Sequence, residues 1–371
     1  MHRICGTLLL ALAPVAGLSA AEARLVSPDV HADGSVTFRI KAPLAQAVAV
    51  TGDWDSWKEK KPLTKGDGGV WSVTLGPWSP DIFQYTFELD GLALPDPENP
   101  WLTSSTVWGK HSFVEVKGDG KEPWALRDVP HGTLATHTYV SRVTGQTRRV
   151  VVYTPPSYAK GNDRYPVLFL LHGFGGDETD WTAVGRAQLI ADALIADRKA
   201  RPCLIVMPDT HAVPAQAEAG PPDGRYDWSR NVELFDRDLA EEVVPLIEAR
   251  YRTSREPEDR AVAGLSMGGA LSFTIGLAHL EHFAWVGSMS GGSADTETLL
   301  ARRAPDVVNR KLRLLWIACG RGDTLIEGNR QLVAQLAARG IHHVWKETEG
   351  GHTWLVWRRN LAELLPLLFR R

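Results

Sequence analysis

The first third of the chain contains short stretches in which apolar and polar residues alternate. Alternation over a few residues, with β-branched and aromatic side chains prominent, is typical of strands that bury one face. Such stretches occur at 35–40, 48–50, 70–75 and 83–89. Clusters of Asp and Gly separate them, as at 66–69, and are typical of turns. Strands of this length and spacing predict a small, all-β, immunoglobulin-like sandwich over residues 24–117.

The pattern changes beyond residue 117. Residues 118–133 are rich in Gly, Asp, Lys and Pro and are predicted to be a linker. Beyond them, wholly apolar runs, typical of strands buried on both faces of a parallel sheet, alternate with amphipathic stretches of helical spacing. The strands are expected at 149–153, 167–171, 203–207, 261–263, 284–289 and 312–318, and helices include 239–251 and 329–339. This alternation predicts an α/β fold over residues 134–371.

The N-terminus has a third pattern, that of a targeting segment. Met1-His2-Arg3 supplies a short basic start, and the apolar stretch 8–18 that follows is too short to span a bilayer. Small residues suitable for cleavage follow at 19–23. We therefore expect residues 1–23 to be a signal peptide and the mature protein to be secreted or periplasmic.

Composition narrows the classes of partner and cofactor. The formal net charge is −3 and no basic block stands out, so we expect no nucleic-acid partner. Of the three cysteines, Cys5 lies in the expected signal peptide. Cys203 and Cys319 lie in apolar runs and are expected to be buried thiols, although an oxidising compartment leaves a disulfide open. No cluster has metal-ligand spacing, so no metal and no organic cofactor is expected.

The motif Gly-Leu-Ser-Met-Gly at 264–268 is the strongest chemical signal. It follows a predicted strand and precedes a helical stretch at 269–278, which is the setting of a nucleophile elbow in the α/β-hydrolase fold. The turn is sharp, so the positions two before and two after the serine need residues without side chains, and both are glycine. The helix N-terminus also favours negative charge that develops beside it. We therefore predict Ser266 as the nucleophile.

A second glycine-rich motif, His-Gly-Phe-Gly-Gly at 172–176, ends an upstream strand, where this fold places half of its oxyanion hole. The predicted donors to the oxyanion are the backbone amides of Met267 and Phe174. Gly173 is expected to border the substrate. His172 is expected to organise the loop rather than to act as a base.

The remaining catalytic residues should follow the nucleophile in the order serine, acid, histidine. Five histidines follow Ser266: His279, His282, His342, His343 and His352. Only His352 comes just after a predicted strand, at 343–348, and so lies at the carboxyl edge of the sheet, where active-site groups collect. Asp323, on the loop after the strand at 312–318, is the predicted acid, and Asp295 is the alternative.

These motifs together resemble carbohydrate esterase family 1, which includes feruloyl and acetylxylan esterases and lies close to esterase D and the enterobactin esterases. The resemblance covers residues 134–371 and rests on 172–176, 264–269, Gly-Arg-Gly-Asp at 320–323 and Gly-Gly-His-Thr-Trp-Leu-Val-Trp at 350–357. It implies a serine esterase that acts through an acyl-enzyme, most simply on feruloyl esters of plant cell-wall polysaccharides. Trp354 is expected to contact the substrate, and the polar segment 210–230 to form part of the rim of the acyl pocket.

Two other functions stay open. One is hydrolysis of a siderophore or another small ester, which also suits an N-terminal β domain. The more remote one is a carbohydrate-binding protein with an inactive hydrolase domain, against which the complete set of catalytic residues argues.

The sandwich resembles the family 48 carbohydrate-binding module, which lies beside starch- and glycogen-acting enzymes and precedes some feruloyl esterases. The resemblance rests on Val-Thr-Gly-Asp-Trp-Asp-Ser-Trp at 50–57, Gly-Val-Trp at 69–71 and Asp-Pro at 96–97. Trp54, Trp57 and Trp71 could stack on sugar rings, lie in the core or pack on the next domain. Further tryptophans, Trp101 and Trp108, and the short linker favour an aromatic surface close to the catalytic domain. We expect the sandwich to shape the active-site entrance more than to bind glycan alone.

Overall fold

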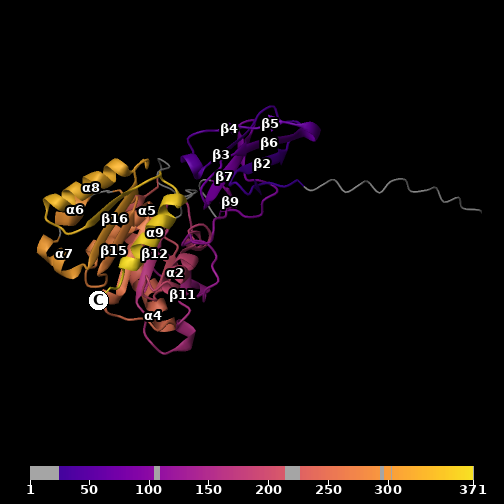
Figure 1. Cartoon of the computed structure of the whole chain (residues 1–371). Coiled ribbons are helices and arrows are strands. Elements are labelled where there is room, and N and C mark those ends of the chain that lie inside the picture. The colour runs from indigo at the N-terminus through magenta and orange to yellow at the C-terminus, as the bar shows by residue number, and fades with distance from the viewer. Residues whose placement is uncertain (1–24, 104–108, 214–225, 293–295, 302, 371) are drawn as a thin grey trace, which may run out of the picture.

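The structure is a computed structural model that describes residues 25–103, 109–213, 226–292, 296–301 and 303–370. Four of the predictions above fall wholly or partly outside these residues. They concern the signal peptide at 1–23, Trp108, Asp295 and most of the polar segment 210–230. Figure 1 shows the sandwich and the larger α/β domain side by side.

Two antiparallel sheets form the sandwich. One sheet has the order β1 (Asp29–Val30), β2 (Val36–Lys41), β6 (Val70–Leu75) and β5 (Thr64–Lys65). The other joins β4 (Lys61–Pro62), β3 (Val48–Gly52), β7 (Asp81–Leu89) and β8 (Leu92–Leu94), and β9 (Ser112–Val116) also pairs with β7. Phe38, Tyr85 and Phe87 fill the space between the sheets and are fully buried. The predicted all-β domain is confirmed.

Strand β7 differs from the half-buried strand that its alternating sequence predicts. Its first seven residues are all buried. Phe83 packs in the core of the sandwich, whereas Ile82, on the opposite face, packs in the core of the α/β domain. The second face of the strand is therefore covered by the other domain rather than by water.

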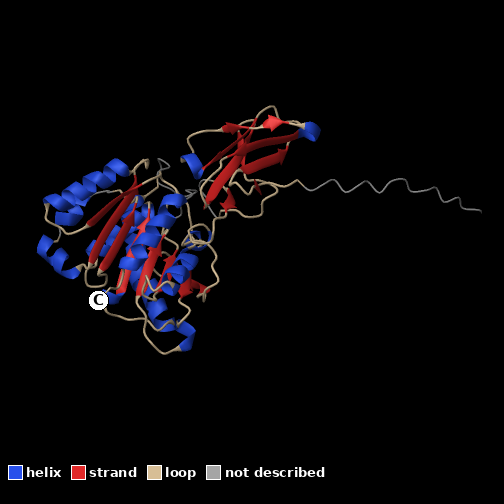
Figure 2. Cartoon of the chain, in the orientation of Figure 1, coloured by secondary structure: helices blue, strands red, loops and turns tan. Residues whose placement is uncertain are grey.

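The α/β domain contains an eight-stranded sheet of order β10-β11-β13-β12-β14-β15-β16-β17. The strands are β10 (Thr133–Val140), β11 (Thr147–Thr154), β12 (Val167–Leu171), β13 (Leu204–Pro208), β14 (Arg260–Leu265), β15 (Trp285–Met289), β16 (Leu314–Gly320) and β17 (Val344–Thr348). β10 and β11 are antiparallel to their neighbours, and the other strands are parallel. Helices cover both faces, as Figure 2 shows, so the predicted α/β-hydrolase fold is confirmed.

The helices bury both faces of the central strands. They are α1 (Asp180–Ala183), α2 (Ala187–Ala196), α3 (Trp228–Asp238), α4 (Val244–Arg250), α5 (Met267–Ala278), α6 (Thr296–Ala301), α7 (Pro305–Lys311), α8 (Ile326–Ala338) and α9 (Trp354–Leu364). In β12, Leu168 and Leu170 face the core that contains α2 and α9, whereas Phe169 faces the core that contains α5 and α8. This two-sided burial explains why the strand is apolar throughout. No helix among the described residues is long and apolar enough to cross a membrane.

The segment 118–133, predicted as a linker, is packed onto the α/β domain. Trp124 is buried in the domain core, and the Gly132 amide donates to Asp192 at 2.9 Å. The last residue of the segment, Thr133, already begins β10. The sequence did not predict β10 because none of its residues is buried at this edge of the sheet and its apolar residues form no continuous run.

A buried ion pair joins the two domains. Arg358 of α9 is fully buried, and its guanidinium lies 2.7 Å from the Asp81 carboxylate of β7. The same group donates to the carbonyl oxygens of Val184 and Ile82. Arg359 holds the second Asp81 oxygen at 2.7 Å. Because each buried charge is paired and hydrogen-bonded, the sandwich is fixed against the α/β domain.

Arg358→Met is expected to lower the free energy of unfolding by about 3–5 kcal/mol, because Asp81 would stay buried without its main counter-charge. Urea denaturation measures the loss. Arg359→Met is the matched control: the side chain of Arg359 is 45% exposed, and we expect a loss of only about 1 kcal/mol. Equal, small losses in both variants would show that the ion pair does not hold the domains together.

Candidate active site

Ser266 lies between β14 and α5 at a strained turn. Its φ and ψ are 51° and −119°, a conformation that a residue with a side chain rarely adopts. A Cβ atom on Gly264 would overlap the Gly268 carbonyl, and one on Gly268 would overlap the His172 carbonyl. The glycines are thus required by the close approach of backbone segments, as the motif predicts.

The structure brings the three predicted catalytic side chains together. His352 Nε2 lies 2.9 Å from Ser266 Oγ, so the hydroxyl can donate to the imidazole. His352 Nδ1 lies 2.9 Å from Asp323 Oδ2 and donates to it. Burial opposes ionisation of Asp323, but the hydrogen bond and charge of His352 outweigh it and hold the pKa of Asp323 below its ordinary value. The carboxylate therefore fixes the tautomer that leaves Nε2 as the acceptor.

The second glycine-rich loop lies directly beside the nucleophile. An added Cβ on Gly173 would lie 3.3 Å from the Cβ of Ser266. Phe174 is the next residue on this loop. Met267 is the first residue of helix α5, so the amide of Met267 belongs to the first turn, where N–H groups have no acceptor within the helix. These positions are those expected of the two oxyanion donors.

His172 organises this loop, as the sequence predicted. It is buried, and its Nδ1 donates to the Gly173 carbonyl at 2.8 Å. The Thr210 amide donates to its Nε2 at 2.8 Å. A second histidine, His211, accepts from the Gly175 amide at 3.0 Å, and burial lowers its pKa to about 4, so it is neutral and able to accept. No motif in the sequence indicates this role of His211.

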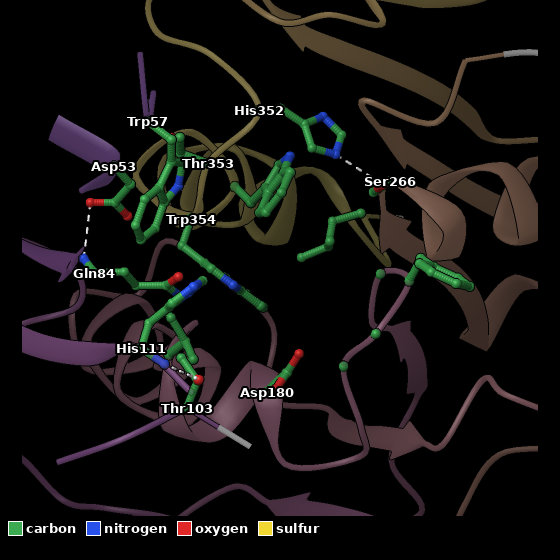
Figure 3. Close-up of a pocket in the computed structure, with 17 residues that line it drawn as sticks. Asp53, Trp57, Gln84, Thr103, His111, Asp180, Ser266, His352, Thr353 and Trp354 are labelled. Atoms are coloured by element: carbon green, nitrogen blue, oxygen red, sulfur yellow. Dashed lines mark hydrogen bonds between the residues drawn. The ribbon is translucent and has the colours of Figure 1, made fainter. Parts of the chain in front are cut away.

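A pocket of about 420 Å³ opens at Ser266 and His352 and is lined by both domains (Figure 3). The α/β domain contributes Gly173, Phe174, Gly175, Gly176, Asp180, Val184, Leu265, Ser266, His352, Thr353, Trp354 and Trp357. The sandwich contributes Asp53, Trp57, Gln84, Thr103 and His111. Gly173 and Trp354 line the pocket, and their contact with the substrate stays a prediction. The sandwich therefore forms part of the pocket wall, as expected, and its weaker role in glycan binding stays a prediction.

The three tryptophans considered for sugar stacking have different surroundings. Trp54 stacks on Trp78 with ring centroids 4.8 Å apart, and Trp71 is buried in the core of the sandwich. Only Trp57 reaches the pocket, where its ring lies 4.6 Å from that of His111. The remaining sandwich residues of the pocket, including Asp53 and Gln84, were missed, because their role depends on how the domains meet.

The sandwich also touches the loop that carries the catalytic histidine. A Cβ atom on Gly351, which precedes His352, would overlap the side chain of Ser56. Ser56 and Trp57 both have a φ of 63°, a left-handed conformation unusual for residues other than glycine. This strained turn therefore packs against the loop of His352.

Gly351→Ala is expected to lower kcat/KM by about tenfold to a hundredfold, because the new methyl group must push His352 or the sandwich turn aside. Steady-state kinetics on any accepted ester measures the loss. Ser56→Gly in the same chain removes the overlap and suits the positive φ, so it should restore most of the activity. If the double variant is no better than Gly351→Ala, the overlap with Ser56 is not the cause.

Asp53 is an unusual member of the pocket lining. It is 2% exposed, its Oδ1 accepts from the Gln84 amide at 2.9 Å, and its Oδ2 has no hydrogen-bond partner among the described residues. Burial raises the pKa of Asp53 to about 7, although the charge of Arg358 opposes the shift.

Asp53→Asn should therefore gain stability relative to the wild type as the pH rises. The unfolded chain releases the Asp53 proton near pH 3.8, whereas the folded protein keeps it to about pH 7. Between these values the Asp53 carboxyl lowers the unfolding free energy of the wild type by about 1.4 kcal/mol per pH unit. The side-chain amide of the variant does not titrate and makes no such contribution. Urea denaturation of both proteins across this interval checks the prediction. A difference that stays constant with pH would mean that Asp53 is ionised in the folded protein.

Other reactive side chains lie away from the pocket. Within the described part of the chain, one group could hold a metal ion: His279, Glu281 and His282, at the opposite end of α5 from Ser266. His279 is held by Asp236 at 2.8 Å and by Glu281 at 3.2 Å, so two of the three members already form an ion pair. Cys203 and Cys319 are free and buried, and burial raises the pKa of each thiol to about 12. The alternative of a disulfide between them is thus wrong.

The chain is similar to known esterases along most of its length. Residues 141–368 match the family described as "Putative esterase", and residues 26–105 match carbohydrate-binding module 48, the isoamylase N-terminal domain. An endo-1,4-beta-xylanase/feruloyl esterase of Xylanibacter ruminicola is 32% identical over 350 residues. These make up 92% of this chain but only 46% of that protein, so the chain spans less than half the length of this relative.

Solved structures share the fold. A ferulic acid esterase is 26% identical, with a TM-score of 0.52 over 64% of this chain and 97% of the other. An enterobactin esterase from Shigella flexneri is 21% identical, with a TM-score of 0.67 over 90% of this chain and 92% of the other. The second likeness extends over both the sandwich and the α/β domain.

Proposed function

Since the chain belongs to the esterase family that matches residues 141–368, we propose that it is a serine carboxylic-ester hydrolase that prefers feruloyl or related hydroxycinnamoyl esters of plant cell-wall polysaccharides. The observation that carries the proposal is the hydrogen-bonded series Asp323, His352 and Ser266 at the pocket. Similarity over 92% of the chain to a protein named for feruloyl esterase activity supports the choice of acyl group.

In the first half of the proposed reaction, Ser266 Oγ attacks the ester carbonyl carbon while His352 Nε2 accepts its proton. The carbonyl oxygen becomes an oxyanion, which the amides of Met267 and Phe174 stabilise by several kcal/mol. The intermediate then collapses: the ester C–O bond breaks, and His352 returns the proton to the departing alcohol oxygen. The acyl group stays on Ser266.

Water completes the proposed reaction. His352 Nε2 takes a proton from a water molecule, whose oxygen attacks the acyl carbon, and a second oxyanion forms in the same hole. Its collapse breaks the bond to Ser266 Oγ, which regains the proton from His352 and releases the carboxylic acid. Asp323 stays ionised throughout and stabilises the imidazolium that forms twice in each turnover.

The walls of the pocket suit an aromatic acyl group. Val184, Leu265, Trp354 and Trp357 give the pocket an apolar surface, and the ring of Trp357 lies 4.8 Å from that of His352. Trp354 and Trp357 lie edge to face, with centroids 5.5 Å apart, and hold each other in place. A flat, conjugated acyl chain gains more from such a surface than an acetyl group does.

Comparison of kcat/KM for methyl ferulate, acetylated xylan, p-nitrophenyl acetate and a catecholate siderophore ester tests the substrate. We expect methyl ferulate to give the highest value among the natural acyl groups. Turnover of the siderophore ester alone would favour that alternative, and absence of all turnover by the folded protein would favour the inactive, glycan-binding one.

We also propose that the chain is exported, on the strength of the signal-like residues 1–23. The N-terminal sequence of the mature protein and its recovery from periplasm or medium are the tests. A mature protein that still begins at Met1 inside the cell would contradict this proposal.

A further inference from the structure

The wall of the pocket that belongs to the sandwich differs in chemistry from the wall beside the nucleophile. Ser266 and His352 lie on one side of the cavity in Figure 3, and Asp53, Gln84 and His111 lie on the other. On the α/β side, Leu265 directly precedes Ser266 and the ring of Trp357 lies 4.8 Å from that of His352, whereas the residues that the sandwich contributes are mostly polar. The cavity therefore passes from an apolar section at the reacting bond to a polar section at the sandwich.

A strained turn supplies one part of the polar section. Backbone hydrogen bonds from Ser56 to Asp53 and from Trp57 to Gly52 hold the turn closed, and two successive residues have positive φ. Such strain costs about 1–2 kcal/mol per residue and persists where surrounding contacts require it. Its result here is that Trp57 faces the pocket and packs against the ring of His111.

Two buried polar side chains, Asp53 and Gln84, supply the remaining part of the polar section. Asp53 Oδ2 is buried without a hydrogen-bond partner among the described residues. A buried polar atom left in this way costs about 1–3 kcal/mol, and a ligand that binds it recovers that free energy. The side-chain amide of Gln84 extends into the cavity beside it (Figure 3). Asp53 can donate when protonated and accept when ionised, and Gln84 can do both.

We infer that Asp53, Trp57, Gln84 and His111 form a specificity subsite, built by the sandwich, that binds the ring hydroxyl of a hydroxylated aromatic acyl group. This inference rests on the proposed function. The aromatic plane lies along Trp57, the ring hydroxyl reaches Asp53 and Gln84, and the apolar section next to Ser266 holds the carbon chain that leads to the carbonyl. The sandwich thus selects the acyl group.

The arrangement favours an aromatic acid over a sugar as the occupant. A sugar ring carries hydroxyl groups around its whole edge and would leave several of them against the apolar groups Val184, Leu265 and Trp357. A hydroxycinnamoyl group is apolar except at its far end, which matches the order of chemistry along the cavity.

The test compares methyl cinnamate with methyl 4-hydroxycinnamate, which differ by one ring hydroxyl. We expect the wild type to show a kcat/KM about threefold to tenfold higher for the hydroxylated ester, the value of one ordinary hydrogen bond. Gln84→Leu, which keeps the size of the side chain and removes its amide, should bring this ratio close to one. Gln46→Leu is the matched control, since Gln46 is exposed elsewhere on the sandwich, and it should keep the wild-type ratio.

If Gln84→Leu does not fold, Asp53→Asn provides a second variant in which the same ratio of kcat/KM values can be measured. The amide oxygen can still accept from the Gln84 backbone, but the unpartnered oxygen becomes a nitrogen, so the ratio should change at least about twofold. Ratios that stay at the wild-type value in both folded variants would overturn the subsite.

A loss in these variants that is seen with an arabinosyl ferulate but not with methyl 4-hydroxycinnamate would also overturn it, in favour of a sugar site. Failure of the proposed function looks different. The wild type would then hydrolyse p-nitrophenyl acetate through Ser266 but neither aromatic ester.

Discussion

Ser266→Ala is expected to lower kcat by about four to six orders of magnitude while the protein stays folded. Only the hydroxyl oxygen is lost, and its partner among the residues that the structure describes is His352 Nε2 at 2.9 Å. The backbone turn depends on Gly264 and Gly268, which the substitution leaves in place. Turnover of methyl ferulate measures the loss, and a thermal melt shows that the fold is retained. Activity within tenfold of the wild type would place the nucleophile elsewhere.

Asp323→Asn is expected to lower kcat by about three to four orders of magnitude. An amide in this place can donate to His352 Nδ1, and this stabilises the tautomer whose Nε2 carries the proton. That tautomer cannot accept from Ser266. The carboxylate also stabilises the imidazolium, and the amide does not. Single-turnover kinetics separates this loss from any change in binding.

Asp295→Asn is the control for the choice of acid, because Asp295 is the alternative from the sequence. We expect it to keep near-wild-type activity. If Asp323→Asn leaves kcat unchanged and Asp295→Asn lowers it, the acid of the triad is Asp295 and the hydrogen bond of Asp323 to His352 is structural.

The parts of the site that the sequence predicts are those with strictly local requirements. The elbow at Ser266 needs glycine at positions 264 and 268 because backbone segments meet there. Both glycines belong to one short motif, so the sequence shows this requirement directly. His352 and Asp323 could be chosen because each follows a strand of a parallel sheet, whose carboxyl ends share one edge. The fold followed in the same way from apolar runs with two-sided burial.

The parts that could not be predicted depend on how distant segments meet. Asp53 and Gln84 belong to the sandwich, and they line the pocket of Ser266 because of how the two domains pack, with the Arg358–Asp81 ion pair among the contacts that join them. Nothing near either residue in the sequence indicates this. The exposed strand β10 was missed for a related reason: an edge strand that gains little burial has no clear apolar pattern.

Covalent labelling tests the central claim most directly, that Ser266 is the activated nucleophile of an esterase. The wild type is treated with a fluorophosphonate ester, which reacts with activated serines, and the adduct is located by peptide mass spectrometry while turnover of methyl ferulate is followed. We predict one adduct per chain, on the peptide that contains Ser266, with activity lost in proportion to labelling and no adduct in Ser266→Ala. An adduct on a different serine that tracks the loss of activity, or full activity after complete labelling of Ser266, would contradict the account.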